Sequence, residues 1–391
     1  MQLIKLLFFL SLFTIFYAYV GYGILLYLII RIKNIIKKSP RSDELKEIDY
    51  EPFVSIVIPA YNEIDFLDDK IKNTYSLNYP QNKIEIIVIT DGSSDYSDKY
   101  LKENYPFIKV LHEPERKGKS YALNKGLKYA NGEIIIFTDA NTYLNSDSIK
   151  NIVKHFTNPK VGCVAGSKRV KEIKDTPGEG ESLYWKYEEF LKKLNSDFNC
   201  AIGAVGEILA VRKEIAQPIP NDTVIDDFVL SMNIAYSGYK VVFEPNAYAI
   251  EKPSLNEKEE LKRKIRIATG AFQTLFRYLN WLNFFKTPIL SFQYFSYKVL
   301  RWTFVPFCIP LTFLLNLLLF FYSNLYLYKL LFILQVFLYI LVLSYYMKIT
   351  KFKLAKIIFY ILFMNYSMLL GFFKYIKGEK HFVWEKAKRI K

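Results

Sequence analysis

The sequence predicts an α/β protein in which a mostly parallel sheet is covered by helices on both faces and is attached to membrane-spanning segments. Between Phe53 and about Glu251, short runs of β-branched and other apolar residues alternate with amphipathic stretches. Near-continuous apolar strands that are separated by helices are typical of parallel sheets buried on both faces. Long apolar segments lie on both sides of this region, toward the two ends of the chain.

Hydrophobic periodicity places the individual elements. Apolar runs predict strands at 53–61, 84–91, 108–112, 133–140, 161–166 and 239–251. Helical periodicity predicts helices at 120–130, 148–156, 178–198 and 225–237. A basic amphipathic helix is predicted at 255–279, and such a helix is expected to lie partly on the membrane surface.

The first 30 residues predict a membrane anchor. The run 3–30 is apolar apart from Lys5, and about 20 apolar residues suffice to cross a bilayer. A cleaved signal peptide would have a shorter apolar region and a cleavage site of small residues, so a permanent anchor is favoured. Three further spans fit the apolar C-terminal region, at 303–322, 329–347 and 355–373.

These patterns predict a division of the chain into six parts. They are an anchor with its basic flank (1–38), a linker (39–52), the sheet domain (53–254), interfacial helices (255–300), about three membrane helices (301–376) and a basic tail (377–391).

The basic cluster that follows the anchor predicts the orientation. The run from Arg31 to Lys38 favours the cytoplasmic side, so the N-terminus is predicted outside and the sheet domain inside a multi-pass plasma-membrane protein. Three later spans would then leave the basic tail outside, although basic flanks favour the inside. An extra or re-entrant pass, which could include 284–300, would remove this conflict, and the sequence leaves both topologies open.

Charge and cysteine content argue against nucleic acid as a partner, against a disulfide framework and against a zinc site. The net charge of +15 fits juxtamembrane flanks that face anionic lipid, and no basic-aromatic recognition motif accompanies it, so nucleic acid is not an expected partner. The cysteines, Cys163, Cys200 and Cys308, are far apart in the chain. Their spacing predicts neither a disulfide framework nor a zinc site.

Acidic side chains follow three predicted strands. Glu63 comes after the first strand, Asp91 ends the second, and Asp139 and Asn141 come at the end of a later one. Ligands of open parallel sheets bind beyond the carboxyl ends of the strands. Asp and Asn also end strands as ordinary turn formers, which would by itself explain Asp91-Gly92. The three ends together favour a binding site.

Two further groups are candidates for chemistry. Lys119 opens a predicted helix, where an anion could bind both its ammonium group and the helix N-terminus. For the neighbouring Arg116 and Lys117, a solvated loop is the preferred interpretation. Asp226 and Asp227 begin another predicted helix, where they could be helix-dipole partners or could supply a general base, and their position does not decide between the two.

The ordered motifs of this chain resemble a known family. VSIVIPAYNE, DGSSD, GKSYALN, TDAN, GAVGEILAVRKE and VIDDF resemble motifs of the family 2 glycosyltransferases with the GT-A fold. RKIRIATGAFQ and FVWEKAKR are similar to segments of the membrane-integrated branch, which includes cellulose, chitin, hyaluronan and poly-N-acetylglucosamine synthases. The resemblance extends over nearly the whole chain. It implies a Rossmann-like GT-A domain at the cytoplasmic face, flanked by transmembrane helices.

The resemblance also implies an activity in cell-surface polysaccharide synthesis. This is inverting transfer from a nucleotide diphosphate sugar, with a UDP-sugar as the expected donor, to a glycan or lipid-linked acceptor, and it requires Mg or Mn. By position in the motifs, Glu63, Asp91, Lys119, Asp139 and Arg266 would bind the nucleotide sugar. The same correspondence implies Asp139 and Asn141 as metal ligands, and Asp227, beside Asp226, as the catalytic base.

The chain departs from the family pattern at two positions. Asn141 replaces an acidic metal ligand, so the diphosphate would supply more of the coordination. Ile267 stands where processive synthases carry a tryptophan that bounds the acceptor site. This favours limited transfer over processive polymer synthesis, which remains an alternative, as does a non-catalytic sugar-nucleotide sensor or scaffold. Tyr184 and Trp185 could stack on an acceptor sugar, but core packing with Phe190 is favoured.

Overall fold

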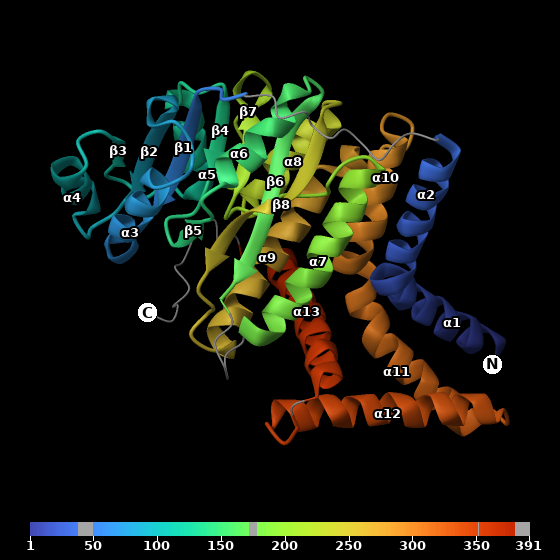
Figure 1. The fold of residues 1–391 in the computed structure, drawn as a ribbon. Coiled ribbons are helices and arrows are strands. Elements are labelled where there is room, and N and C mark those ends of the chain that lie inside the picture. The colour runs from blue at the N-terminus through green and yellow to red at the C-terminus, as the bar shows by residue number, and fades with distance from the viewer. Residues whose placement is uncertain (38–49, 172–177, 351, 380–391) are drawn as a thin grey trace.

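The computed structural model describes residues 1–37, 50–171, 178–350 and 352–379. Most of the predicted linker (39–52) and of the basic tail (377–391) therefore lies outside the described residues. An α/β domain forms one half of the molecule, and the long apolar helices lie together on one side of it (Figure 1).

The domain is built on one eight-stranded sheet with the strand order β3-β2-β1-β4-β7-β6-β8-β5. The strands β3, β2, β1 and β4 are parallel, as are β6 and β8, whereas β7 runs antiparallel between β4 and β6, and β5 runs antiparallel to β8. The strands are β1 (Val54–Ala60), β2 (Ile84–Asp91), β3 (Lys109–Glu113), β4 (Ile134–Phe137), β5 (Thr142–Leu144), β6 (Val161–Val170), β7 (Leu209–Arg212) and β8 (Lys240–Glu251).

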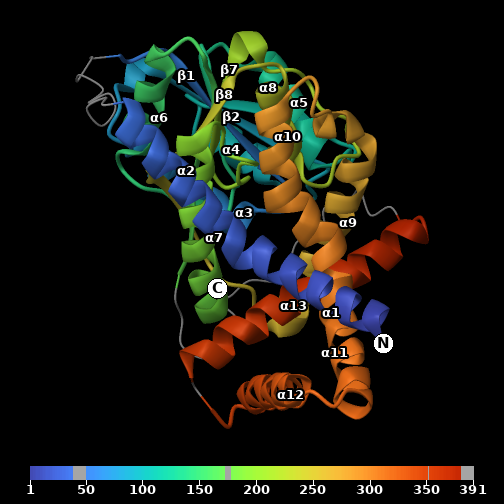
Figure 2. The same cartoon turned by 90° about the vertical axis from the view of Figure 1, so that its right-hand side faces the viewer.

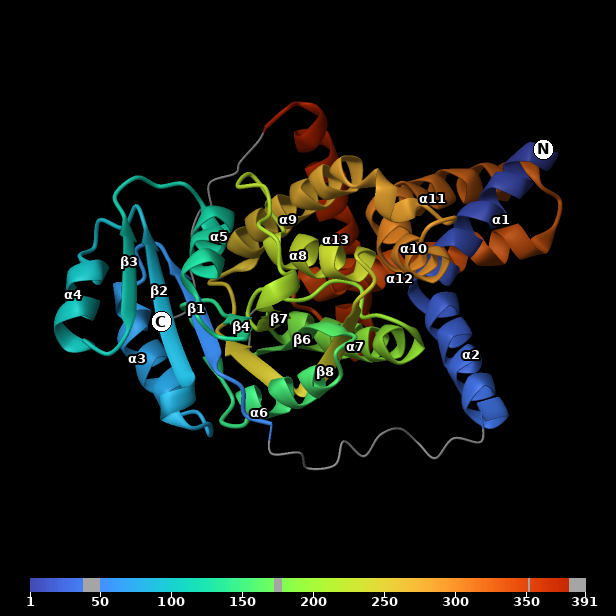
Figure 3. The same ribbon diagram turned by 90° about the horizontal axis from the view of Figure 1, so that it is seen from above.

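Helices cover both faces of this sheet, as the sequence predicts. Alternate residues of a strand point to opposite faces, so Val57 packs into one core and Ile56 and Ile58 pack into the other. Figure 3 shows α3 and α5 on opposite sides of β1 and β2. The helices of the domain are α3 (Ile64–Tyr75), α4 (Ser97–Asn104), α5 (Lys119–Tyr129), α6 (Ser148–Val153), α7 (Gly178–Phe198), α8 (Asp226–Tyr236) and α9 (Glu257–Arg277).

Several elements differ from the predicted ones. The strand β6 extends beyond the predicted 161–166 to Val170, and the helices α3 and α4 are absent from the prediction. The strand predicted at 133–140 ends at Phe137, because Thr138 and Asp139 leave the sheet to form a loop. The helix predicted at 148–156 ends at Val153 and continues as a 3₁₀ turn. The strands β5 and β7 are missing from the sequence prediction. They have three and four residues, which is too few for a hydrophobic period, and their burial depends on neighbours far away in the chain.

Four helical segments are long and apolar enough to cross a membrane: Gln2–Ile36, Pro288–Tyr322, Tyr326–Tyr346 and Lys353–Ile376. The first consists of α1 (Gln2–Phe16) and α2 (Tyr22–Lys37), which meet at a π-helical turn, Tyr17–Gly21. The second consists of α10 (Pro288–Tyr294), the π-helical segment η6 (Phe295–Phe304) and α11 (Val305–Tyr322). The third and fourth are α12 (Tyr326–Tyr346) and α13 (Lys353–Ile376).

The last three of these helices bring the chain back to the domain. In Figures 1 and 2, α11 runs away from the domain, α12 lies across its far end, and α13 returns. The end of α13 packs on α9, where a Cβ at Gly371 would overlap the side chain of Ala268, so this close approach requires glycine. The arrangement therefore places the C-terminal end of α13 beside the domain. Three successive membrane crossings by α11, α12 and α13 would instead place that end on the far side of the membrane.

Candidate active site

A cavity of about 760 Å³ lies where the sheet domain meets α7, α9 and the membrane helices. Its walls combine the loop after β4, the starts of α5 and α8, and side chains of η6 and α13. The sequence-predicted site residues that line it are Lys119, Asp139, Asn141, Asp226, Asp227 and Arg266.

Lys119 is the electrostatic centre of this cavity. Its ammonium nitrogen lies 2.6 Å from Asp139 Oδ1 and 3.7 Å from Asp226 Oδ2. Burial disfavours the ammonium form, but the Asp139 and Asp226 carboxylates outweigh burial and raise the pKa of Lys119 above its usual value. Lys119 is the first residue of α5, so the positive end of the helix dipole adds to its charge. The cavity is thus prepared to bind an anion.

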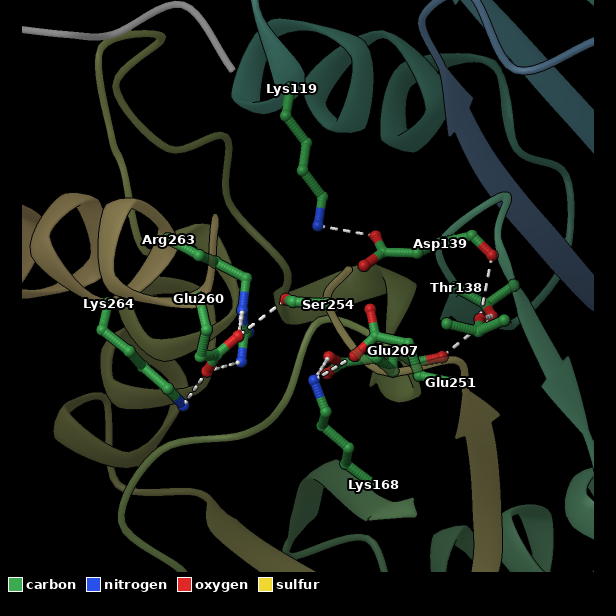
Figure 4. A network of polar contacts seen from close by, with 11 residues as sticks. Lys119, Thr138, Asp139, Lys168, Glu207, Glu251, Ser254, Glu260, Arg263 and Lys264 are labelled. Atoms are coloured by element: carbon green, nitrogen blue, oxygen red, sulfur yellow. Dashed lines mark hydrogen bonds and ion pairs between the residues drawn. The ribbon is translucent and has the colours of Figure 1, made fainter. Parts of the chain in front are cut away.

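A buried lysine supports the loop that carries Asp139. The Lys70 ammonium donates to Thr138 Oγ1 and to the Thr142 carbonyl, each at 2.8 Å, from either side of Asp139. The Thr138 hydroxyl also donates to the Glu207 carbonyl at 2.8 Å. Figure 4 shows Lys119 reaching down to Asp139 above this layer. The loop is therefore held in place before any ligand binds.

Asp227 has the properties of a general base. Burial and the neighbouring Asp226 carboxylate raise its pKa to about 7, although Lys119 opposes the shift. Its Oδ1 accepts a hydrogen bond from the Phe228 amide at 2.8 Å, which fixes the carboxylate at the start of α8. A base whose pKa lies close to neutral pH combines a large ionised fraction with a strong driving force for proton transfer.

Arg266 enters the cavity from α9. Within the part of the chain that the structure describes, no carboxylate lies within ion-pair distance of its guanidinium, although Asp226, Asp139 and Asp227 all act on its charge. The neighbouring Arg263 is instead bonded to Glu260, which also accepts from Ser254 (Figure 4). Arg266 is thus available for an anionic ligand.

Glu63 and Asp91 lie outside the residues that line the cavity. Glu63 is completely buried at the start of α3. The Asp91 carboxylate accepts hydrogen bonds from the backbone amides of Lys117 at 2.9 Å and Gly118 at 2.7 Å. Gly118 has a φ of +100°, which glycine adopts without strain, and it leads directly into Lys119. Asp91 therefore holds the loop that positions Lys119.

Asp139 and Asn141 suit a divalent cation that binds together with a substrate. Both line the cavity, and their carboxylate and amide oxygens are ligands that Mg²⁺ and Mn²⁺ accept. No group of three or more His, Cys, Asp or Glu side chains that could hold a metal occurs among the described residues. The protein supplies few ligands, as is usual where substrate phosphates complete the coordination of a cation.

The cavity also contains residues that the sequence analysis does not assign to a site. Tyr184 and Trp185 line it, and Trp185 also packs against the hydrophobic core, as predicted. Phe190 is 52% exposed, so the prediction is wrong for Phe190. Other unassigned wall residues are Lys168, Glu188, Lys192, Glu207, Lys298 and Trp302. Lys298 could have been found from the sequence, because a charged residue within an apolar segment often marks a functional site.

Comparison with known proteins identifies the domain. Residues 55–217 match Glycosyl transferase family 2. Residues 55–217 thus form a domain of this family. A mannosyltransferase from Pyrobaculum calidifontis, solved in complex with GDP-Man and Mn²⁺, superposes with a TM-score of 0.71 at 22% identity and covers 95% of this chain and 99% of its own. This likeness shows the GT-A fold that the sequence predicts for the glycosyltransferase.

Curated relatives extend the similarity beyond the family 2 domain. The poly-beta-1,6-N-acetyl-D-glucosamine synthase of Staphylococcus aureus (strain MSSA476) is 28% identical over 297 residues, which cover 73% of this chain and 68% of the synthase. The synthase of the same name from Staphylococcus epidermidis is 26% identical over 266 residues, which cover 65% and 63% of the two chains. This chain is thus a glycosyltransferase whose likeness to the synthases reaches beyond residues 55–217.

Proposed function

We propose that this glycosyltransferase is an inverting enzyme of cell-surface polysaccharide synthesis. It transfers a sugar from a nucleotide diphosphate sugar, with a UDP-sugar as the expected donor, to a glycan or lipid-linked acceptor. One observation carries the proposal: Lys119, 2.6 Å from Asp139 and 3.7 Å from Asp226, lines the same cavity as Asp227, the candidate base. The resemblance of the chain to polysaccharide synthases supports the biological role.

The donor diphosphate binds to Lys119 and Arg266. Both are cationic, both line the cavity, and they come from separate elements, α5 and α9. Asp91 positions the loop that carries Lys119. Asp91 and Glu63 lie at the carboxyl ends of β2 and β1, where the nucleoside would be bound. Cations that are fixed near the leaving group stabilise the negative charge that develops as the glycosidic bond breaks.

A divalent cation would be held by Asp139 and Asn141. When bound, it would neutralise part of the diphosphate charge and so assist departure of the leaving group. Lys70, through Thr138 and the Thr142 carbonyl, keeps these ligands in place. Because Lys119 contacts Asp139, a cation held by Asp139 would repel the ammonium group and favour its contact with the phosphates.

Asp227 removes the proton from the acceptor hydroxyl. The acceptor oxygen forms a bond to the anomeric carbon as the bond to the diphosphate breaks, and its proton passes to the Asp227 carboxylate. Asp227 and the cations assigned to the diphosphate line one cavity. In the proposed reaction, the acceptor attacks on the side opposite the leaving group. A single displacement of this kind inverts the anomeric centre.

The proposal includes the orientation of the membrane helices. The four apolar helical segments lie on one side of the domain, which is the arrangement expected for a multi-pass protein with its catalytic domain at the membrane surface. The basic residues at the C-terminal end of the first segment, from Arg31 onward, support a cytoplasmic position for the domain.

Donor turnover by the purified protein tests the proposed function. Wild type should cleave and transfer from a nucleotide sugar in the presence of Mn²⁺ or Mg²⁺, and Asp227→Asn should lose on the order of a hundredfold or more in rate. Asp98→Asn, which alters an ion pair of α4 with Lys102 outside the cavity wall, is the matched control. Wild-type rates in Asp227→Asn would exclude Asp227 as the base.

A processive synthase is the second candidate, and the named relatives favour it. The cavity supplies an aromatic residue, Trp302 of η6, although Ile267 replaces the expected tryptophan on α9. Product length decides between the two. A ladder of long chains from one acceptor supports processive synthesis, and single additions exclude it.

A further inference from the structure

Lys192 is a buried cation in the wall of the cavity that no carboxylate neutralises by direct contact. It is 5% exposed and lines the cavity from α7. Its ammonium group faces the rings of Trp185 at 5.5 Å and Phe243 at 5.9 Å. Across the described part of the chain, no Asp or Glu oxygen lies within ion-pair distance of it. A buried ammonium in this state is costly unless a ligand compensates its charge.

Glu188, the carboxylate expected to pair with Lys192, is bonded to other residues. Glu188 precedes Lys192 by four residues on α7, a spacing at which Glu and Lys normally pair. Glu188 instead accepts from Arg301 at 2.6 Å and from the Tyr297 hydroxyl at 2.6 Å, and its other ion pair is with Lys298 at 3.3 Å. These positive charges hold the pKa of Glu188 well below its usual range in spite of burial.

Lys298 brings a second cation to the same part of the cavity. After burial, its charge is the main influence that lowers the pKa of Lys192 to about 8. Among the described residues, Lys298 and Arg301 thus both pair with Glu188, whereas Lys192, one helical turn away, has no carboxylate within ion-pair distance. Like charges that are buried together repel, and an anion bound between two of them removes the repulsion.

This cationic pair is separate from the cations assigned to the donor diphosphate. Lys119 and Arg266 come from α5 and α9, and Lys119 pairs with Asp139. Lys192 and Lys298 come from α7 and η6, and Lys298 pairs with Glu188. Both pairs act on the charge of Asp227, so the candidate base lies between two basic groups, of which the donor diphosphate accounts for one.

The surroundings of Lys298 point to an acceptor with an apolar tail. Lys298 and Trp302 come from η6, and Met364 comes from α13, both within segments long and apolar enough to cross a membrane. The cavity is therefore continuous with the membrane helices on the Lys298 side. A lipid chain needs such an apolar path from the cavity to the membrane, whereas a water-soluble ligand does not.

We propose that the acceptor is a lipid-linked sugar phosphate whose phosphate binds between Lys192 and Lys298. Its sugar hydroxyl lies at Asp227, and its lipid chain leaves the cavity between η6 and α13. This inference rests on the proposed transferase function and adds the chemical class of the acceptor. The bonds that form and break remain those of the single displacement at the anomeric carbon.

Equilibrium binding without any donor tests the inference. The full-length protein in phosphatidylcholine nanodiscs is titrated with three probes: a polyprenyl-linked sugar 1-phosphate, the same sugar 1-phosphate without a tail, and a polyprenyl glycoside that lacks phosphate. The first probe should bind tightest. Lys192→Met should weaken its binding by about tenfold or more, because a hydrogen bond to a charged group is lost. Lys192→Arg, which keeps the charge, should remain close to wild type.

Lys193→Met is the matched control, since Lys193 is exposed on α7 and pairs with Asp197. It should bind the lipid-linked phosphate like wild type. Equal affinity in wild type and a folded Lys192→Met variant would overturn the phosphate site. Equally tight binding of the tail-free phosphate would overturn the lipid, and equally tight binding of the phosphate-free glycoside would overturn the phosphate. Failure of the wild type to turn over any donor is a separate result, which refutes the transferase function and not the binding site.

Discussion

The Lys119 ammonium group lies 2.6 Å from one oxygen of Asp139, so a cation of the protein contacts the residue expected to bind the metal ion. A metal ion held by Asp139 would place a second positive charge beside the Lys119 ammonium group, and the two would repel. This repulsion would favour contact of Lys119 with a phosphate oxygen of the donor. The ion pair holds both groups in place in the absence of a ligand.

Lys119→Met should weaken donor use and leave the fold intact. A hydrogen bond to a charged group contributes about 1.5–3 kcal/mol, so kcat/KM for the donor should fall roughly tenfold to a hundredfold. Steady-state kinetics at several donor concentrations measure the effect. Lys128→Met, on the last turn of the same helix, is the control and should behave like wild type. An unchanged kcat/KM in Lys119→Met would remove Lys119 from the donor site.

The transfer rate should rise with pH through neutrality. Asp227 acts as a base only when it is ionised, and its pKa is raised to about 7, so kcat should fall about tenfold per pH unit well below 7 and level off above it. Rates measured between about pH 5.5 and 9 test this. A profile that stays flat down to the usual range of an aspartate would contradict the assignment.

The charged groups around Asp227 give a second, directional test. Burial contributes most to the raised pKa of Asp227, the Asp226 and Glu207 charges add to it, and Lys119 opposes it. Asp226→Asn removes one negative neighbour, so the midpoint of the rate profile should move to lower pH. A shift to higher pH would show that Asp226 does not act on Asp227 through its charge.

Lys70→Met should affect metal use through the position of the loop. The Lys70 ammonium group donates hydrogen bonds to Thr138 and to the Thr142 carbonyl on either side of Asp139, and Lys70 does not line the cavity. Loss of these bonds should raise the Mn²⁺ concentration for half-maximal activity about tenfold, and saturating Mn²⁺ should restore most of kcat. Lys72→Met, an exposed change two residues away on α3, is the control. A loss of kcat that Mn²⁺ cannot restore would argue against a positioning role.

The sequence was sufficient for the local part of this architecture. The strand end at Asp91 and the helix starts at Lys119 and Asp226 follow from runs of apolar residues and from turn chemistry, which depend on near neighbours. The short antiparallel strand β7 could not be predicted, because its burial between β4 and β6 depends on residues far away in the chain.

The membrane side of the cavity could not be predicted for the same reason. Glu188 and Lys192 have the spacing of an ordinary surface pair, and only the arrival of Arg301 from η6 shows that Glu188 is occupied. Trp185 packs against the core, as its helical spacing predicts, but its position in the cavity wall depends on elements far away in the chain. Contacts between the sheet domain and the membrane helices leave no periodic pattern of apolar residues in the sequence.

Gly371→Val should destabilise the protein. Gly371 allows α13 to approach α9 at Ala268, and added methyl groups there would force the helices apart. Overpacking of this kind typically costs about 1–3 kcal/mol. Thermal unfolding in detergent should show a lower Tm, and the donor KM should rise because α9 carries Arg266. Phe373→Val, at an exposed position of the same helix, should leave the Tm close to wild type.

The returning path of α13 predicts that its end and the catalytic domain lie on the same side of the membrane. Since α12 lies across the far end of α11, the chain needs no third full crossing before Gly378 (Figure 1). In a Cys308→Ser background, in which the buried Cys163 and Cys200 are protected, Gly378→Cys and Lys193→Cys should react with an impermeant maleimide in inside-out vesicles. Neither should react in intact cells. Labelling of Gly378→Cys from the outside would instead mean that α11, α12 and α13 each cross the bilayer, and that the basic residues after α13 lie opposite the domain.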